Sequence, residues 1–136
     1  MTNITESKSK ESSDLSNIKL DWLTICKLDD IAKNTGVCAD FKGKQVAIFH
    51  MKSSSNNDAA NGISEVKAVC NLDPFAEASV LSRGLITEKD SQYFVASPLL
   101  KQEFCLETGQ CQQDDSVAIN IYKARINGDL VQLMEA

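Results

Sequence analysis

The chain of 136 residues consists of short apolar segments separated by turn residues, and no window holds a long apolar stripe at helical spacing. Asn127-Gly128 is the strongest hairpin signal, and Gly43 and Gly109 fall in two further turns. Only 75–81 is a candidate helix. Turn signals at intervals of roughly 8–12 residues predict a small all-β fold, an antiparallel sandwich or barrel. The expected strands are 24–28, 36–39, 45–51, 63–70, 93–97, 103–106, 110–112, 118–126 and 130–133.

Residues 1–18 are polar and rich in serine, so they bury too little apolar surface to offset their chain entropy. We expect a disordered tail there and a single β domain over residues 19–136. Within this domain, the polar and turn-rich stretch 52–62 is predicted to be an exposed loop.

Charge and hydropathy exclude several classes of partner. The net charge of −5 opposes binding to a polyanion, so no nucleic-acid partner is expected. The longest apolar run, 46–49, is far shorter than the roughly 20 residues that span a bilayer, and no basic start with an apolar run indicates a secretory signal. We expect a cytoplasmic protein without membrane contact.

The chain has one histidine, His50, which excludes every site that needs two imidazoles. It alternates with apolar neighbours in the middle of a predicted strand, which favours a structural role over that of a catalytic base. The adjacent pairs Asp29/Asp30 and Asp114/Asp115 point to opposite faces in extended chain and are predicted to be solvated turn residues. No phosphate-binding glycine loop is present. From its residues alone, the chain has no evident active centre.

The five cysteines form no Cys-x-x-Cys pair, which argues against a zinc ribbon or knuckle. We expect small, half-buried, reduced side chains. Whether Cys105 and Cys111 meet across a turn and bridge under oxidation stays open at this point. The other three are Cys26, Cys38 and Cys70.

Two segments together resemble the cluster-binding loops of Rieske iron–sulfur domains. The first comprises 71–75 (Asn-Leu-Asp-Pro-Phe) and 80–84 (Val-Leu-Ser-Arg-Gly), and the second runs from Val95 to Cys111. In that family the loops carry Cys-x-His and Cys-x-x-His, which hold a 2Fe–2S cluster. The resemblance implies a Rieske-like antiparallel β fold in which all four ligand positions are changed. Their occupants here are Asp73, Phe75, Ser97 and Leu100.

The particular loop sequences resemble one branch, the small subunits of assimilatory NAD(P)H-dependent nitrite reductases. Segments 22–31 and 45–49 also fit this branch, so the match covers about residues 20–134. The long loop at 52–62 and the polar tail depart from it. The resemblance implies a subunit with no catalytic residue, metal or cofactor of its own. The expected partner is a large subunit that carries FAD, an iron–sulfur cluster and siroheme and reduces nitrite to ammonium.

Loops that persist without their ligands are expected to serve as a docking surface, with an apolar centre and a polar rim. Other roles stay open for several members: Phe75 and Leu100 filling the cluster space as core, Arg83 and Gly84 fixing a turn, and Lys101 as a solvated charge. Alternatives for the whole chain are a stand-alone binding or regulatory module and a ferredoxin-type electron carrier. The predicted docking residues are Asp73, Pro74, Phe75, Arg83, Ser97, Pro98, Leu99, Leu100 and Lys101.

Overall fold

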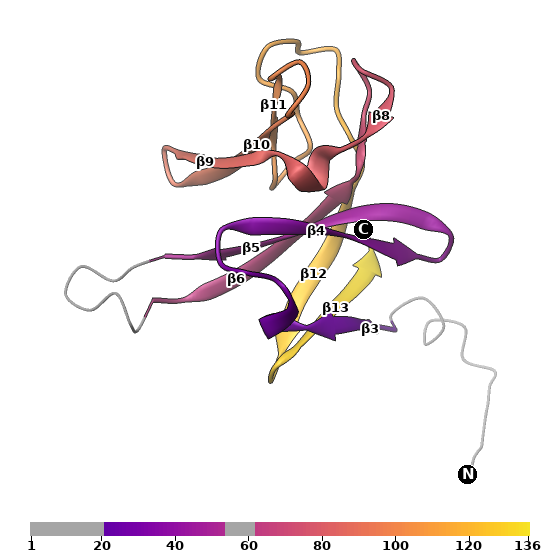
Figure 1. The fold of residues 1–136 in the computed structure, drawn as a ribbon, viewed down its shortest axis with the longest axis vertical. Helices are drawn as coiled ribbons and strands as arrows, with labels where there is room; N and C mark the ends of the chain where they lie inside the picture. The colour runs from indigo at the N-terminus through magenta and orange to yellow at the C-terminus, as the bar shows by residue number, and fades with distance from the viewer. Residues whose placement is uncertain (1–20, 54–61) are drawn as a thin grey trace.

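The computed structural model describes residues 21–53 and 62–136, so the predicted tail and most of the predicted loop lie outside the described residues. Its lower part is a curled antiparallel sheet of six strands in the order β3-β13-β12-β6-β5-β4 (Figure 1). These strands are β3 (Leu23–Lys27), β4 (Thr35–Phe41), β5 (Lys44–Lys52), β6 (Ser64–Cys70), β12 (Ile121–Asn127) and β13 (Leu130–Glu135).

The upper part in Figure 1 contains two smaller antiparallel sheets and the loops between them. One sheet has the order β11-β10-β9, and the other pairs β7 with β8. The strands are β7 (Leu72–Asp73), β8 (Ala78–Ser79), β9 (Leu85–Lys89), β10 (Gln92–Ala96) and β11 (Glu103–Cys105). Two single 3₁₀ turns complete the described fold, η1 (Leu28–Asp30) and η3 (Leu81–Arg83). No helix in the described residues is long and apolar enough to cross a membrane.

The structure confirms the all-β prediction and corrects several elements. The helix expected at 75–81 is absent; residues 74–77 form turns, Glu77 adopts a left-handed φ of 55°, and only η3 is helical. Strand β9 was not predicted, because its turn into β10 is built by Asp90 and Ser91 at positive φ, without the glycine that marks most such turns. The predicted strand 110–112 is reduced to isolated bridges, and β12 begins only at Ile121.

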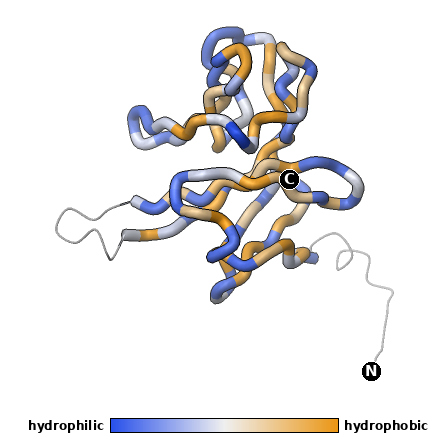
Figure 2. The backbone as a smooth tube through the Cα atoms, in the orientation of Figure 1, coloured by the Kyte–Doolittle hydropathy of each residue, from blue (hydrophilic) through white to orange (hydrophobic). Residues whose placement is uncertain are grey.

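Strand β5 is buried on both faces, and this joins the two parts of the molecule. Val46 and Ile48 enter the core inside the curled sheet, together with Phe41, Val131 and Leu133. The alternate side chains of β5 enter a second core between the sheets; its members include Ala47, Phe49, Met51, Leu81, Val95 and Phe104. Figure 2 shows the hydrophobic backbone segments meeting along this junction.

His50 confirms its predicted structural role. It is buried on β5, its Nδ1 lies 2.8 Å from the carbonyl oxygen of Ile31, and its Nε2 lies 2.9 Å from the hydroxyl of Ser64. Both ring nitrogens therefore have partners within the protein.

Candidate docking site

The first of the two predicted docking loops folds around Asp73. One carboxylate oxygen of this buried residue, Oδ1, accepts hydrogen bonds from the backbone N–H groups of Phe75 (2.9 Å) and Ala76 (3.3 Å). Its backbone carbonyl accepts a third from Glu77 at 2.8 Å. Asp73 thus closes its own turn, as aspartate side chains commonly do.

The second loop folds around Ser97 in a similar way. Its hydroxyl accepts a hydrogen bond from the N–H of Leu99 (3.3 Å), and its carbonyl accepts one from the N–H of Lys101 (3.1 Å). The same hydroxyl donates to Oδ2 of Asp73, at 2.5 Å. A buried hydrogen bond between side chains therefore links the two loops.

Asn71 fixes the first loop to the six-stranded sheet. Its buried side chain accepts a hydrogen bond from the N–H of Ser82 (2.7 Å) and donates to the carbonyl of Ser79 (3.1 Å) and to Oε1 of Gln45 on β5 (3.3 Å). This role of Asn71 was not predicted from the sequence. A polar residue at the end of an apolar strand was the only signal in the sequence.

Two glycines permit close backbone approaches around the loops. A Cβ on Gly84 would lie 2.3 Å from the carbonyl oxygen of Ala96, and one on Gly36 would lie 2.8 Å from the carbonyl oxygen of Ser82. Both contacts are too short for any larger residue. Gly84 therefore lets the first loop lie against the end of β10, where the second loop begins.

Phe75 and Leu100, which stand at two former ligand positions, have different environments. Phe75 is partly buried and packs against Phe104, with 6.2 Å between ring centroids. Leu100 is 52% exposed, so it does not fill a core. Of the two, only Phe75 packs against the core.

Not all of the predicted docking residues are exposed in the structure. Asp73 and Ser97 are buried and hydrogen bonded to each other. The prediction that their side chains are surface contacts is therefore corrected, because they support the loops from inside. Pro74, Arg83, Pro98, Leu99, Leu100 and Lys101 are exposed, and Phe75 is partly exposed. Leu85, which follows Gly84 and pairs with Ala96, adds an apolar side chain that is 69% exposed.

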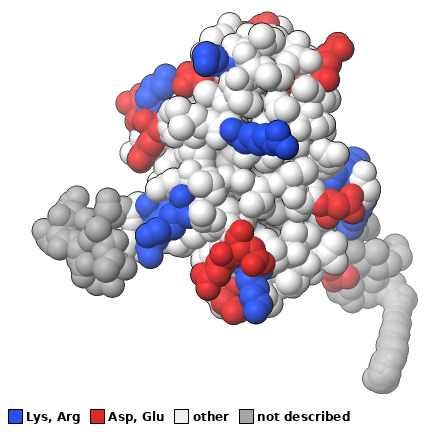
Figure 3. Space-filling model, in the orientation of Figure 1, with Lys and Arg blue, Asp and Glu red and all other residues white. Residues whose placement is uncertain are grey.

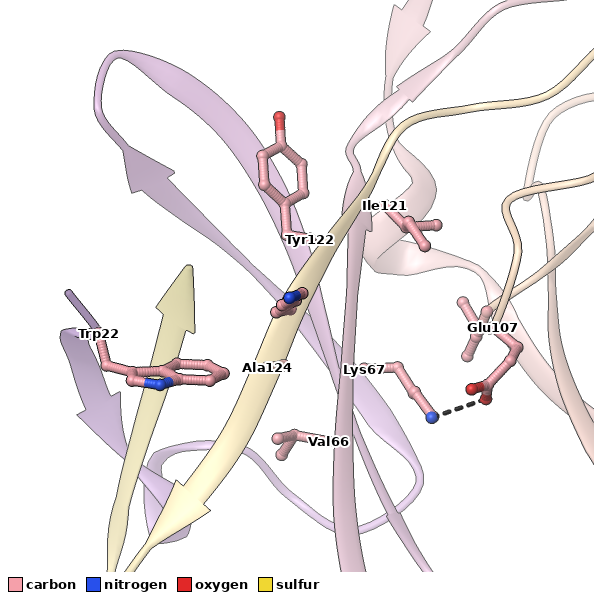
Figure 4. A pocket seen from close by; sticks show the side chains of 9 residues that line it. Trp22, Val66, Lys67, Glu107, Ile121, Tyr122 and Ala124 are labelled. Carbon is pink, nitrogen blue, oxygen red and sulfur yellow. Dashed lines mark ion pairs between the residues drawn. The ribbon is translucent and has the colours of Figure 1, made fainter. Parts of the chain in front are cut away.

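A separate groove of about 350 Å³ is lined by residues of β6 and β12, together with Trp22, Leu106 and Glu107 (Figure 4). Lys67 forms an ion pair with Glu107 at 2.7 Å on one side, and the Trp22 ring lies on the other side of β12. Arg125 stacks over that ring at 4.4 Å from its centroid. These contacts engage Lys67, Glu107 and Trp22 with protein partners.

Comparison with known proteins identifies the family. Residues 21–134 match the model of the Rieske-like [2Fe-2S] domain. The "Nitrite reductase (NADH) small subunit" of Salmonella typhimurium is 48% identical over 112 residues, which are 82% of this chain and 95% of that protein. The chain belongs to this small-subunit family. The match also confirms the resemblance seen in the loop sequences.

Solved structures of the small-subunit family have the same fold. The solution structure of the Escherichia coli protein NirD is 46% identical and has a TM-score of 0.68, covering 83% of this chain and 94% of that one. The crystal structure of a putative NADH-dependent nitrite reductase small subunit from Mycobacterium tuberculosis is 34% identical and has a TM-score of 0.69, covering 83% and 93%.

A further relative is of a different kind. A segment of the Klebsiella oxytoca "Nitrite reductase [NAD(P)H] large subunit" is 31% identical over 110 residues, which are 81% of this chain but 10% of that protein. In Klebsiella oxytoca, a domain like this small subunit is therefore part of a much longer polypeptide.

The residues of this small-subunit chain do not fit the 2Fe–2S cluster that the wider Rieske-like family implies. Phe75 and Leu100 have no lone pair to bind iron, and the Asp73 carboxylate is already bonded to Ser97 and to backbone N–H groups. Over residues 21–53 and 62–136, no three His, Cys, Asp or Glu side chains gather as metal ligands.

The cysteines of the chain are free, and none stands at positions 73, 75, 97 or 100. Cys111 forms an isolated antiparallel β-bridge with Phe104, and both side chains lie in the same core. Cys105 is the strand partner of Phe94. Since successive strand residues point to opposite faces, the Cys105 and Cys111 side chains diverge. This geometry opposes a disulfide between them.

Proposed function

We propose that this chain is the non-catalytic small subunit of a cytoplasmic NAD(P)H-dependent nitrite reductase that reduces nitrite to ammonium. Its role is to bind the large subunit, which carries siroheme, an iron–sulfur cluster and FAD. The observation that carries the proposal is the 48% identity to a nitrite reductase (NADH) small subunit along nearly the whole of that relative. The loops support a role through contact, since the side chains of Asp73 and Ser97 hold them together while Leu100 stays exposed.

The Klebsiella oxytoca relative supports the choice of partner. A similar domain is part of that large subunit, where the covalent link keeps it at a high effective concentration beside the rest of the chain. A separate chain has no such link and must bind through a surface of its own.

The two loops offer such a surface. Leu99 and Leu100 are each 52% exposed, and Pro74, Pro98 and Leu85 add apolar atoms around them. Exposed apolar groups beside charged ones are typical of interaction sites. The Asp73–Ser97 hydrogen bond and the Asn71 contacts hold the loops in place, which reduces the entropy lost on binding.

Co-expression with a large subunit from the same organism tests the function. We expect the two chains to co-purify and the NAD(P)H-dependent reduction of nitrite to ammonium to fall when this chain is omitted. Equal activity with and without the chain, in the absence of co-purification, would contradict the proposal.

Matched double variants test the surface. Replacing Leu99 and Leu100 with serine is expected to weaken binding of the large subunit at least about tenfold, because buried apolar anchors dominate interfaces. The control replaces Leu23 and Ile63, two exposed apolar residues of the six-stranded sheet and its margin, with serine. Equal binding by both double variants would show that Leu99 and Leu100 are not part of the interface.

A further inference from the structure

Two cations flank the exposed leucines of the loop surface. Arg83 ends η3, directly before Gly84, and Lys101 follows Leu100 at a left-handed φ of 68°. Neither forms an ion pair within the described part of the chain. By contrast, Lys67 is bound to Glu107 at 2.7 Å, and Lys89 lies 3.8 Å from Glu103.

The segments that follow the two loops in the sequence are acidic. In residues 85–96 and 103–119, six of the seven charged side chains are carboxylates, and Lys89 is the seventh. In the loops at 72–84 and 97–102, the charged side chains are Asp73, Glu77, Arg83 and Lys101, and Asp73 is buried. The loops therefore present more positive than negative charge, in a chain whose net charge is −5. On the face drawn in Figure 3, charged side chains are scattered over a largely uncharged surface, so no single-sign field dominates it.

An apolar centre with unpaired cations at its edge selects a partner of complementary chemistry. Apolar atoms on the partner would cover Leu85, Leu99 and Leu100, and carboxylates at its rim would face the two cations. A basic rim would instead place like charges opposite each other, which is costly at an interface.

We propose that the large subunit receives the loops on an apolar surface bordered by carboxylates, which pair with Arg83 and Lys101. This inference rests on the proposed function and specifies the chemistry of the partner surface. It also predicts that rim charges act mainly on the rate and salt dependence of association, while the leucines supply salt-independent affinity.

Titration of purified large subunit with this chain, in about 50 mM and about 500 mM NaCl, tests the proposal. The variant Arg83→Glu/Lys101→Glu is compared with Lys33→Glu/Lys123→Glu, which changes the net charge equally at exposed sites outside the loops. We expect the loop reversal to weaken binding about tenfold more than the control at low salt, and the difference to shrink to about threefold or less at high salt. Arg83→Lys/Lys101→Arg is expected to keep most of the affinity.

The outcomes separate this inference from the function beneath it. If the unaltered chain binds, but the loop reversal matches its control at both salt concentrations, the acidic rim is contradicted and the proposed function stands. Tighter binding by the loop reversal would indicate a basic rim and would also contradict the inference. If the unaltered chain binds at neither salt concentration, both proposals fail. Thermal unfolding of each variant confirms that the exposed substitutions leave the fold intact.

Discussion

The Ser97 hydroxyl donates a hydrogen bond to Oδ2 of Asp73 at 2.5 Å, and this contact joins loops that are 24 residues apart in the sequence. Both residues stand where the loop resemblance places cysteine ligands in cluster-binding Rieske domains. In this chain, a buried hydrogen bond between the two side chains holds the loops together.

A double-mutant cycle measures this link. Asp73→Ala leaves the Ser97 hydroxyl and the N–H groups of Phe75 and Ala76 without their acceptor, so we expect a loss of about 2–3 kcal/mol in the free energy of unfolding. Ser97→Ala is expected to cost about 1–2 kcal/mol. The double variant should cost less than the sum by about 0.5–2 kcal/mol, as measured by urea denaturation. Ser79→Ala, at an exposed serine of the first loop, is the matched control; strictly additive costs would contradict the link.

Phe75 and Leu100 are predicted to differ in their effect on stability. Phe75→Ala removes a partly buried ring from Phe104 and should lower the free energy of unfolding by about 2 kcal/mol, below the range for fully buried rings. Leu100→Ala at an exposed position should change it by no more than about 0.5 kcal/mol. Calorimetry on both variants checks this. Equal losses would mean that Leu100 is packed as Phe75 is.

The contribution of Asn71 to holding the first loop should be measurable at the Ser82 amide. Asn71→Ala leaves the Ser82 N–H without its side-chain acceptor, and we expect a loss of about 2 kcal/mol in the free energy of unfolding. Hydrogen exchange at the Ser82 amide should accelerate in step, whereas Asn120→Ala at an exposed site should leave both quantities unchanged. Unaltered protection of Ser82 in Asn71→Ala would show that the loop is held by other contacts.

Cysteine accessibility gives a chemical test of the fold. The exposed Cys38 is expected to react first with a thiol reagent, and the buried Cys105 and Cys111 only after unfolding. Mild oxidation of the folded chain should produce no bridge between Cys105 and Cys111. Peptide mapping by mass spectrometry reads both results, and a Cys105–Cys111 disulfide in the folded protein would contradict the strand register.

Asp114 should contribute a small pH dependence. Hydrogen bonds from the Ser116 hydroxyl (2.6 Å) and N–H (3.0 Å) favour its charged form and lower its pKa below the ordinary value. Because the pKa in the folded chain is depressed, the stabilisation is present above the unfolded pKa of about 3.9 and is lost as the pH falls through the folded value. The stability difference between the unaltered chain and Asp114→Asn should therefore shrink below about pH 4. A carboxyl titration by NMR with an ordinary or raised midpoint for Asp114 would contradict this.

Much of the fold could be predicted from local signals. The glycine turn at Gly43 and the apolar run after it predicted the strand that became β5, and Asn127-Gly128 marked a hairpin that the structure contains. The turn at Asp90 and Ser91 was not predicted, because no glycine marks it. These two residues adopt positive φ in a turn that the pairing of β9 with β10 supports. The helix expected at 75–81 is absent because Glu77 adopts a left-handed φ of 55°, which ends the turn, and Ala78 and Ser79 then pair with β7.

The burial of each residue in the two loops could not be predicted from the sequence. The loop resemblance brought Asp73, Phe75, Ser97 and Leu100 together by sequence order. It could not show that the first three turn inward while Leu100 stays exposed, because burial depends on what lies opposite each side chain. The anchoring role of Asn71 needs Gln45 and Ser82, which only the tertiary fold places around it.

The proposed role requires loops that keep a Rieske-like arrangement and act without a cluster. The most direct measurement is iron and acid-labile sulfide in the chain purified anaerobically from iron-replete cells, alone and together with the large subunit. We predict that the isolated chain holds neither element in stoichiometric amount and that its visible spectrum lacks iron–sulfur bands. Two iron and two sulfide per isolated chain, lost on substitution of Asp73 and Ser97, would contradict the account.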